Sequence, residues 1–371
     1  MSKFPIAKLE DWYRQHYFTT EIDISGSGVE DFSLKEVREL AGISHAELDS
    51  LVMRDSRTLG DPVLRQSIAN RYADAHAERV MITNGSSEAI FLLMKALLSP
   101  GDELVILDPH YHSYFNIALT IGCRISRWPL RFEDGFVPML SELERVLSPQ
   151  TKMVIVNFPH NPTGASLSQS EQRRLVDMVA AHGAYLIWDM AFEHLIYGPD
   201  KLIELNGSYQ RVIAVRTLSK AYGLPGIRVG WCIAPPEVFE ECIRVRDFTV
   251  LFMSPLVELI AEKVIDAEER FVRRRFEQAS RNLGYVTRWL ETLGNRVEYV
   301  KPNGGVTVFP RFLGVRNVDA FCTELLAKHN VLLCPGSCFE RSEFVRLGFG
   351  CSSSNLETGL NRLSAFLLDR E

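Results

Sequence analysis

The sequence predicts an α/β fold with a mostly parallel central sheet, followed by a smaller C-terminal α/β unit. From about Leu34 to Val250, short apolar segments alternate with helical stretches. Short segments that are apolar on both faces and bounded by turn residues are typical of strands in a sheet that helices cover on both sides. After Ser254-Pro255, a long helical stretch leads into the second unit.

The strands and helices of the first unit follow from this alternation. We expect strands at Val80–Thr83, Glu103–Leu107, Lys152–Val156, Tyr185–Trp188, Val212–Val215 and Val229–Ala234. The helices between them include Ala89–Leu98 and Glu171–Ala181. In such a sheet, ligands bind at the carboxyl ends of the strands.

An arm precedes the first unit. Ile6–Phe18 has the pattern of a short amphipathic helix, and Asp23–Gly28 is an extended segment rich in serine and glycine. We therefore divide the chain into an N-terminal arm (residues 1–33), a large domain (34–254) and a small domain (255–371). In the small domain we expect three strands and a final helix, at Val306–Phe309, Val331–Leu333, Phe344–Phe349 and about Asn355 to Leu368.

The composition is that of an ordinary globular protein: 46% of the 371 residues are hydrophobic and 24% are charged. The formal net charge of −6 gives no reason to expect binding to nucleic acid or to an anionic membrane surface. No stretch approaches the roughly 20 apolar residues that span a bilayer. The arginine run at residues 273–275 is better explained as a solvated helix face than as a binding patch.

The seven cysteines are scattered and form no Cys-x-x-Cys pair. Cys334 and Cys338 lack clustered histidine partners, so we expect no metal site. The odd number of cysteines and the absence of a signal-peptide pattern predict reduced thiols and a cytoplasmic enzyme.

The most informative segment is Thr217-Leu218-Ser219-Lys220, with Arg228 eight residues after the lysine. Lysines are usually solvated, but this one lies among apolar and turn residues. Desolvation disfavours the charged amine, and a neutral lysine amine can form a Schiff base with pyridoxal phosphate. Arg228 could hold the phosphate. Taken alone, the segment is better explained as a surface lysine and a structural arginine in a Gly-Pro turn.

Two further strands end in polar residues. Asp189 ends the strand Tyr185–Trp188, where a buried carboxylate is costly without a partner. A pyridinium nitrogen would be such a partner, and the pairing would keep the ring an electron sink. Capping of the next turn explains Asp189 equally well. The loop Asn157–Gly164 follows another strand, and its Asn161 can donate to the ring oxygen. We interpret His160 as an exposed loop residue.

The turn Asn84–Glu88 ends a strand and opens an apolar helix. Backbone amides and hydroxyls at a helix N-terminus, here those of Ser86 and Ser87, make an anion site, although an ordinary serine cap is the alternative. Tyr111 follows the strand Glu103–Leu107 and could lie flat on a pyridine ring, with core packing as the alternative.

In this order, the segments resemble the fold-type-I, pyridoxal-phosphate-dependent aminotransferase family along nearly the whole chain. The resemblance implies pyridoxal 5′-phosphate as cofactor, a small amino-acid substrate, and a homodimer with sites at the subunit boundary. It implies cofactor-binding roles for Lys220 (Schiff base), Asp189 (pyridine nitrogen), Asn161 (ring oxygen), Tyr111 (ring face) and, at the phosphate, Ser86, Ser87, Thr217 and Arg228. Arg346 would then bind the substrate α-carboxylate.

Three features depart from the family pattern. Phe192 replaces a tyrosine three residues after the ring aspartate, so one hydrogen bond to the cofactor is missing. Asp55 replaces a tyrosine that reaches the phosphate of the neighbouring subunit. A carboxylate would repel a phosphate, so we expect Asp55 to face a cationic substrate. The entry segment Asp23–Phe32 places carboxylates beside a glycine turn.

These departures resemble one branch of the family, the capreomycidine synthases and their enduracididine-forming relatives. The shared segments are Leu9–Trp12, Asp23–Ser25, Arg54-Asp55 with Leu59–Asp61, Val156–Pro162 and Thr217–Trp231. The resemblance implies elimination of water from a hydroxylated arginine and closure of the guanidine onto the side chain. The main alternative is an ordinary aminotransferase or amino-acid lyase.

The resemblance also suggests which residues bind the substrate. Asp55 and Glu30 are the candidates for the guanidinium group, although each could be a solvated surface carboxylate. The remaining substrate-binding candidates are Ser25, Gly26, Asn161 and Arg346. Capreomycidine-type sequences tend to have histidine where this chain has Glu30, which favours γ-hydroxyarginine and a five-membered enduracididine ring. β-Hydroxyarginine and a six-membered ring are the alternative.

Overall fold

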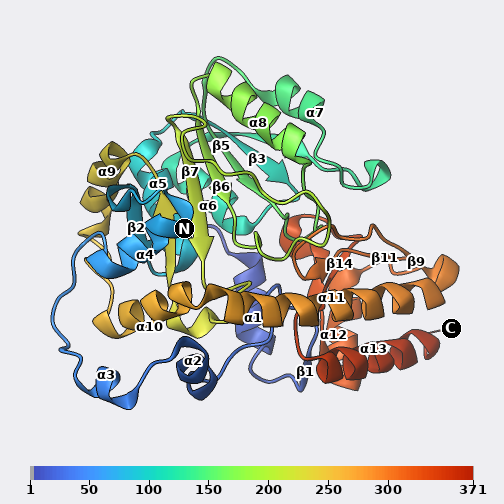
Figure 1. The fold of residues 1–371 in the computed structure, drawn as a ribbon. Coiled ribbons are helices and arrows are strands. Elements are labelled where there is room, and N and C mark those ends of the chain that lie inside the picture. The colour runs from blue at the N-terminus through green and yellow to red at the C-terminus, as the bar shows by residue number, and fades with distance from the viewer. Residues whose placement is uncertain (1–3, 371) are drawn as a thin grey trace.

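The computed structural model describes residues 4–370 and contains a seven-stranded sheet at its centre (Figure 1). Its strand order is β2-β8-β7-β6-β5-β3-β4. Neighbouring strands are parallel from β7 to β4, and β8 runs antiparallel to both of its neighbours. The strands are β2 (Val80–Thr83), β3 (Glu103–Asp108), β4 (Arg124–Pro129), β5 (Thr151–Asn157), β6 (Tyr185–Asp189), β7 (Val212–Thr217) and β8 (Gly230–Ile233). The prediction of a mostly parallel sheet is confirmed.

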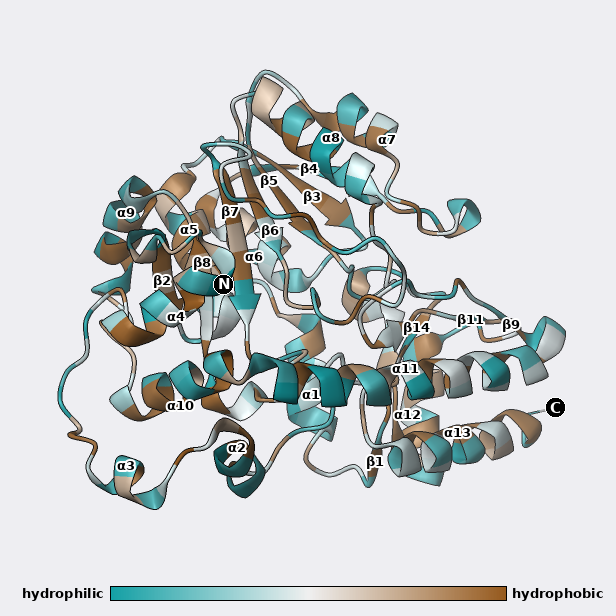
Figure 2. Cartoon of the chain, viewed as in Figure 1, coloured by the Kyte–Doolittle hydropathy of each residue, from teal (hydrophilic) through white to brown (hydrophobic). Residues whose placement is uncertain are grey.

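Both faces of this sheet are buried, as its apolar strands require. Along β3, Leu104 and Ile106 join one core cluster, whereas Val105 and Leu107 join the other. Figure 2 shows the strands in brown between helices that are teal on their outer sides. The large-domain helices are α2 (Leu34–Ala41), α3 (His45–Asp49), α4 (Pro62–Tyr72), α5 (Gly85–Leu97), α6 (His112–Ile121), α7 (Leu140–Val146), α8 (Gln169–Ala181) and α9 (Pro236–Arg246).

Local signals in the sequence explain where several helices begin and end. Ser33 and Glu36 form a capping box at the start of α2, which ends at Gly42 in the left-handed conformation (φ 71°). Ser168 and Glu171 form the same box at the start of α8. The helix therefore begins two residues earlier than predicted.

The second unit contains four helices among the described residues, α10 (Pro255–Asp266), α11 (Glu268–Thr292), α12 (Val318–His329) and α13 (Ser353–Leu368). Short strands lie between them: β9 (Val297–Glu298), β10 (Thr307–Val308), β11 (Arg311–Phe312), β12 (Val331–Leu332), β13 (Cys334–Pro335) and β14 (Val345–Gly348). The strands predicted in this unit are present but shorter. The domain boundaries stay a prediction.

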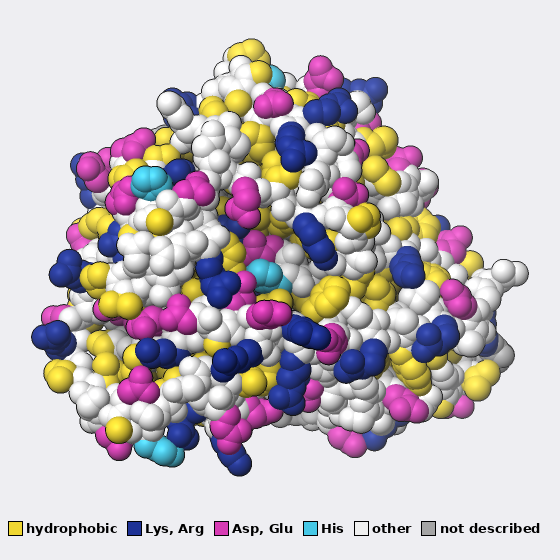
Figure 3. Space-filling model, in the orientation of Figure 1, with side chains coloured by type: hydrophobic (Ala, Val, Ile, Leu, Met, Phe, Trp, Pro, Cys, Tyr) yellow, Lys and Arg dark blue, Asp and Glu magenta, His cyan; other side chains and the backbone are white. Residues whose placement is uncertain are grey.

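The N-terminal arm is part of the second unit's structure. It contains α1 (Lys8–His16) and β1 (Ile22–Asp23), and β1 pairs in parallel with β12. The chain then runs back toward the large domain, so the arm lies between the two units (Figure 1). No helix within residues 4–370 has the length and apolar character needed to cross a membrane. On the face seen in Figure 3, acidic and basic side chains are interspersed, so this face has no continuous basic surface of the kind that nucleic acids bind.

Candidate active site

A cavity of about 940 Å³ opens at the carboxyl ends of the parallel strands, where the large domain meets the arm and the second unit. Most of the predicted site residues line it: Gly26, Glu30, Ser86, Ser87, Tyr111, Asn161, Asp189, Thr217, Lys220, Arg228 and Arg346. They come together because the ends of parallel strands meet at one edge of a sheet. Ser25 and Asp55 lie elsewhere.

Lys220 projects into this cavity from the loop after β7. Its Nζ donates a hydrogen bond to Ser27 Oγ at 3.1 Å, and it lies 5.9 Å from the centroid of the Phe192 ring. Burial lowers the pKa of Lys220 to about 8, and the positive charge of Arg346 acts in the same direction. The amine is therefore partly neutral near neutral pH, as formation of a Schiff base requires.

Asp189 lies at the end of β6, and only 5% of its surface is exposed. Its Oδ1 accepts the Ala191 N–H at 3.0 Å, and its Oδ2 accepts the Tyr114 hydroxyl at 2.6 Å. Burial raises the pKa of Asp189, and this effect is larger than the lowering of the pKa by the two hydrogen bonds. A cationic ring nitrogen would stabilise the ionised form here. Tyr114 was not predicted; it lies on α6, one helical turn after Tyr111.

The start of α5 and Arg228 together form an anion site. Gly85 has a φ of +72°, which favours glycine, and a Cβ atom there would lie 2.5 Å from Arg228 Nη2, so glycine also leaves room for the guanidinium beside the helix. Arg228 Nη1 donates to Ser219 Oγ at 3.1 Å, and Ser219 Oγ also accepts from Thr217 Oγ1 at 2.9 Å. Ser86 and Ser87 line the same part of the cavity, at the positive end of the 13-residue helix. Ser219 adds a hydroxyl that was not predicted.

Arg346 is fully buried on β14 and has three hydrogen-bond acceptors. Its Nη1 donates to Asn161 Oδ1 at 3.1 Å, its Nε donates to the Ser25 carbonyl at 3.0 Å, and its Nη2 donates to the Tyr13 hydroxyl. The Ser25 hydroxyl donates to Asp23 Oδ1 at 2.5 Å. Ser25 therefore supports Arg346 from outside the cavity, which corrects its prediction as a residue that faces the substrate. Tyr13, on α1, was not predicted.

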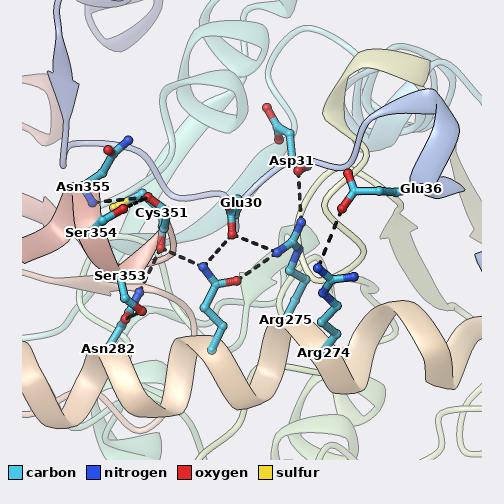
Figure 4. A network of polar contacts seen from close by, with 12 residues as sticks. Glu30, Asp31, Glu36, Arg274, Arg275, Asn282, Cys351, Ser353, Ser354 and Asn355 are labelled. Atoms are coloured by element: carbon cyan, nitrogen blue, oxygen red, sulfur yellow. Dashed lines mark hydrogen bonds and ion pairs between the residues drawn. The ribbon is translucent and has the colours of Figure 1, made fainter.

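Four carboxylates from the arm line the cavity: Glu10, Asp23, Glu30 and Asp31. Glu30 was predicted as a substrate-binding residue, Asp23 and Asp31 belong to the entry segment noted for its carboxylates, and Glu10 was not predicted. One oxygen of Glu30, Oε2, accepts hydrogen bonds from Arg275 Nη1 at 3.0 Å and from Gln278 Nε2 at 2.7 Å (Figure 4). Part of its charge is thus already neutralised. Asp55 is exposed in the segment between α3 and α4, so it could reach a site only in another subunit.

Two predictions about individual side chains were wrong. His160 is buried, with 2% of its surface exposed, and its two ring nitrogens lie 2.8 Å from Thr163 Oγ1 and 3.0 Å from the Pro109 carbonyl. Burial lowers its pKa to about 4. In the arginine run, Arg273 and Arg274 are solvated, but the Arg275 side chain is 4% exposed, since helical rotation turns it toward the arm.

The geometry fits pyridoxal 5′-phosphate. The cavity combines an amine with a lowered pKa, a buried carboxylate that has no cationic partner within hydrogen-bonding distance among residues 4–370, and a helix N-terminus beside an arginine. Tyr111 lies in the same wall, where burial raises its pKa, and its stacking on the cofactor stays a prediction. Across residues 4–370, no three metal-ligating side chains cluster in a way that would hold a metal ion.

Comparison with known proteins agrees with this geometry. Residues 33–363 match the model of the family described as aminotransferase class I and II. Capreomycidine synthase from Streptomyces vinaceus is 42% identical over 362 residues, which cover 97% of this chain and 93% of the synthase. Aspartate aminotransferase from Thermotoga maritima is 29% identical over 315 residues, covering 83% and 81% of the two chains.

Solved structures give the same result. The crystal structure of the PLP-dependent cyclase OrfR in complex with Au has a TM-score of 0.93 and 38% identity, covering 99% of this chain and 98% of the cyclase. A PLP-dependent aminotransferase from Streptococcus suis 89-1591 has a TM-score of 0.94 and 30% identity, covering 100% and 99% of the two chains.

Proposed function

This chain belongs to the aminotransferase class I and II family and is a pyridoxal-phosphate-dependent enzyme, and we propose that it converts a hydroxylated L-arginine into a cyclic guanidino amino acid. The observation that carries the proposal is the charge distribution of the cavity. A buried arginine, Arg346, provides a place for the substrate α-carboxylate, and the arm provides four carboxylates for a cationic side chain. The names of two similar proteins, a capreomycidine synthase and a cyclase, support the same reaction class.

The residues of the chain account for the proposed steps. Arg346 and Asn161 would orient the substrate α-carboxylate, and the Lys220 amine would remove the Cα proton. Pyridoxal phosphate would supply an electron sink when bound, and Asp189 would keep its ring nitrogen protonated. The substrate hydroxyl leaves as water, a guanidine nitrogen bonds to the carbon that lost it, and the ring product forms after a proton returns to Cα.

The position of the hydroxyl decides the ring size. A hydroxyl on Cβ leads to a six-membered ring. A hydroxyl on Cγ requires loss of a second proton from Cβ, which is returned to Cβ after the guanidine has attacked Cγ, and leads to a five-membered ring. Glu30 in place of histidine favours the γ-hydroxy substrate, whereas similarity to a capreomycidine synthase favours the β-hydroxy substrate. Both regioisomers therefore belong in the same assay.

The test is a mass balance. The enzyme is supplied with L-arginine, β-hydroxyarginine or γ-hydroxyarginine, each with and without a keto-acid acceptor. We expect one hydroxyarginine to lose one water without consuming acceptor, and Lys220→Ala to abolish this loss. Stoichiometric transfer of the amino group to the acceptor would instead identify an ordinary aminotransferase.

We also propose that two copies of the chain share their active sites. Asp55 lies outside its own cavity, and the neighbouring Val52 and Met53 side chains are each 67% exposed. Apolar side chains exposed side by side are typical of an interface. The proposal places Asp55 near the guanidinium group bound in the partner subunit. Sedimentation should find a dimer, and a fully active monomer would contradict the proposal.

A further inference from the structure

The part of the arm that crosses the active site, Ser25–Phe32, is here called the strap. On one side it packs on the loop that carries Lys220. The Phe32 N–H donates to the Gly223 carbonyl at 3.1 Å, and the Gly223 N–H donates to the Lys220 carbonyl at 3.0 Å. A Cβ atom on Gly223 would lie 2.7 Å from the Glu30 carbonyl oxygen. The strap and the lysine loop are therefore in direct backbone contact.

On its other side, the strap packs on the segment that follows Arg346. Cβ atoms on Gly348 and Gly350 would collide with the carbonyl oxygens of Gly26 and Gly28. The Gly348 N–H also donates to the carbonyl of Ile24, just before the strap, at 2.8 Å. The strap thus lies between the lysine loop and the carboxylate-binding arginine, so its position affects both.

A row of polar side chains on α11 fastens the strap in this position (Figure 4). Arg275 donates to Glu30 Oε2 and to the Asp31 carbonyl, each at 3.0 Å, and its guanidinium carbon lies 3.8 Å from the Phe32 ring centroid. One turn later, Gln278 donates to Glu30 Oε2 at 2.7 Å and to the Cys351 carbonyl at 3.2 Å.

The same row continues to the Arg346 segment. Asn282 donates to the Phe349 carbonyl at 2.8 Å and to the Cys351 carbonyl at 2.9 Å. Arg275, Gln278 and Asn282 recur at intervals of three and four residues, so they project from one face of the helix. One rigid helix face therefore holds both the strap and the end of the strand that carries Arg346.

We propose that Arg275 and Gln278 are positioning residues that hold the strap against the lysine loop, so that the Ser27 hydroxyl fixes the Lys220 amine for proton transfer. The Ser27–Lys220 contact at 3.1 Å is the point at which the strap touches the reacting group. When Lys220 is released by an incoming substrate, its nitrogen must face the Cα proton. A hydrogen bond to Ser27 restricts the amine to one direction, which lowers the entropic cost of the transfer.

The kinetic part of this inference rests on the proposed function, whereas its structural part does not. The first measurement is therefore hydrogen–deuterium exchange of residues 24–33 in the holoenzyme without substrate. Arg275→Gln removes two hydrogen bonds to the strap, so we expect exchange there to become at least tenfold faster. Arg273→Gln is the matched control, since Arg273 lies on the same helix but pairs with Glu277 at 3.0 Å, and its side chain is 72% exposed. It should leave exchange unchanged.

The second measurement is steady-state kinetics with the hydroxyarginine that the wild type cyclises. Ser27→Ala should lower kcat about tenfold, near the upper end of what one hydrogen bond between neutral groups contributes, with KM within twofold and strap exchange unchanged. Arg275→Gln should lower kcat at least as much. The double variant should be no slower than the slower single variant, since both changes act on the same contact. Arg275→Lys, which keeps the charge, should recover part of the lost kcat.

Three results would overturn the proposal: unchanged strap exchange in Arg275→Gln, kcat within twofold of wild type in Ser27→Ala, or multiplicative effects in the double variant. If Arg275→Gln does not fold, Gln278→Met tests the same attachment of the strap to α11, because it removes the second donor to Glu30 at nearly constant volume. If the wild type cyclises neither hydroxyarginine, the proposed function fails. The exchange experiment still decides whether Arg275 and Gln278 hold the strap in place.

Discussion

Lys220 should make the stability of the cofactor-free protein depend on pH. Its pKa in the folded protein is about 8, against 10.5 for an ordinary lysine. Between these values the unfolded chain binds a proton that the folded chain does not, so the free energy of unfolding rises with pH through this window. At about 1.4 kcal/mol for each unit of pKa difference, the gain between pH 7 and pH 10 is about 2–3 kcal/mol.

The assay is urea unfolding of the cofactor-free protein at pH 7 and pH 10, compared with Lys220→Met. Methionine fills a similar volume without titrating, and every other titratable group is the same in both proteins. The difference in unfolding free energy between the two proteins should therefore move by about 2–3 kcal/mol in favour of wild type at pH 10. A difference that stays constant to within about 0.5 kcal/mol would refute the reasoning that Lys220 is desolvated.

Three further substitutions test the site. Arg346→Gln should lower kcat/KM by at least thirtyfold, because loss of one partner of a buried charge pair costs about 2–5 kcal/mol; a change below threefold would rule out its carboxylate role. Tyr114→Phe removes a hydrogen bond that lowers the pKa of Asp189, so an absorbance titration should find cofactor binding about tenfold weaker, and unchanged affinity would contradict that pairing. Glu30→Gln and Asp55→Asn should each raise KM for the hydroxyarginine about tenfold with cofactor absorbance intact, and a KM within twofold of wild type would rule out guanidinium binding by that residue.

The strands could be predicted where both faces are buried. Val80–Thr83 has the predicted bounds, and most of the other central strands differ by one or two residues at an end, since most of their side chains are apolar. The edge strand β4 was missed because Arg124, Ser126 and Arg127 interrupt its apolar pattern. The pairing of β1 with β12 joins two-residue strands about 300 residues apart, and such short segments carry no detectable period.

Topology explains the predicted site residues at the ends of strands. Asp189 ends a buried strand and Asn161 and Lys220 each follow one, so the parallel topology brings them together. Tyr13, Tyr114 and Ser27 reach the site through packing of the arm and α6, which no local pattern reports. The burial of Arg275 depends on which face of α11 meets the arm, and a run of three arginines does not encode that choice.

The central claim, cyclisation without net amino transfer, is tested most directly by running the reaction in deuterium oxide and analysing the product by NMR. The account predicts a cyclic guanidino amino acid that carries solvent deuterium at Cα. Deuterium at Cα alone, with a six-membered ring, would identify the β-hydroxy route. Deuterium at both Cα and Cβ, with a five-membered ring, would identify the γ-hydroxy route. An open-chain keto acid, or a product without a ring, would contradict the account.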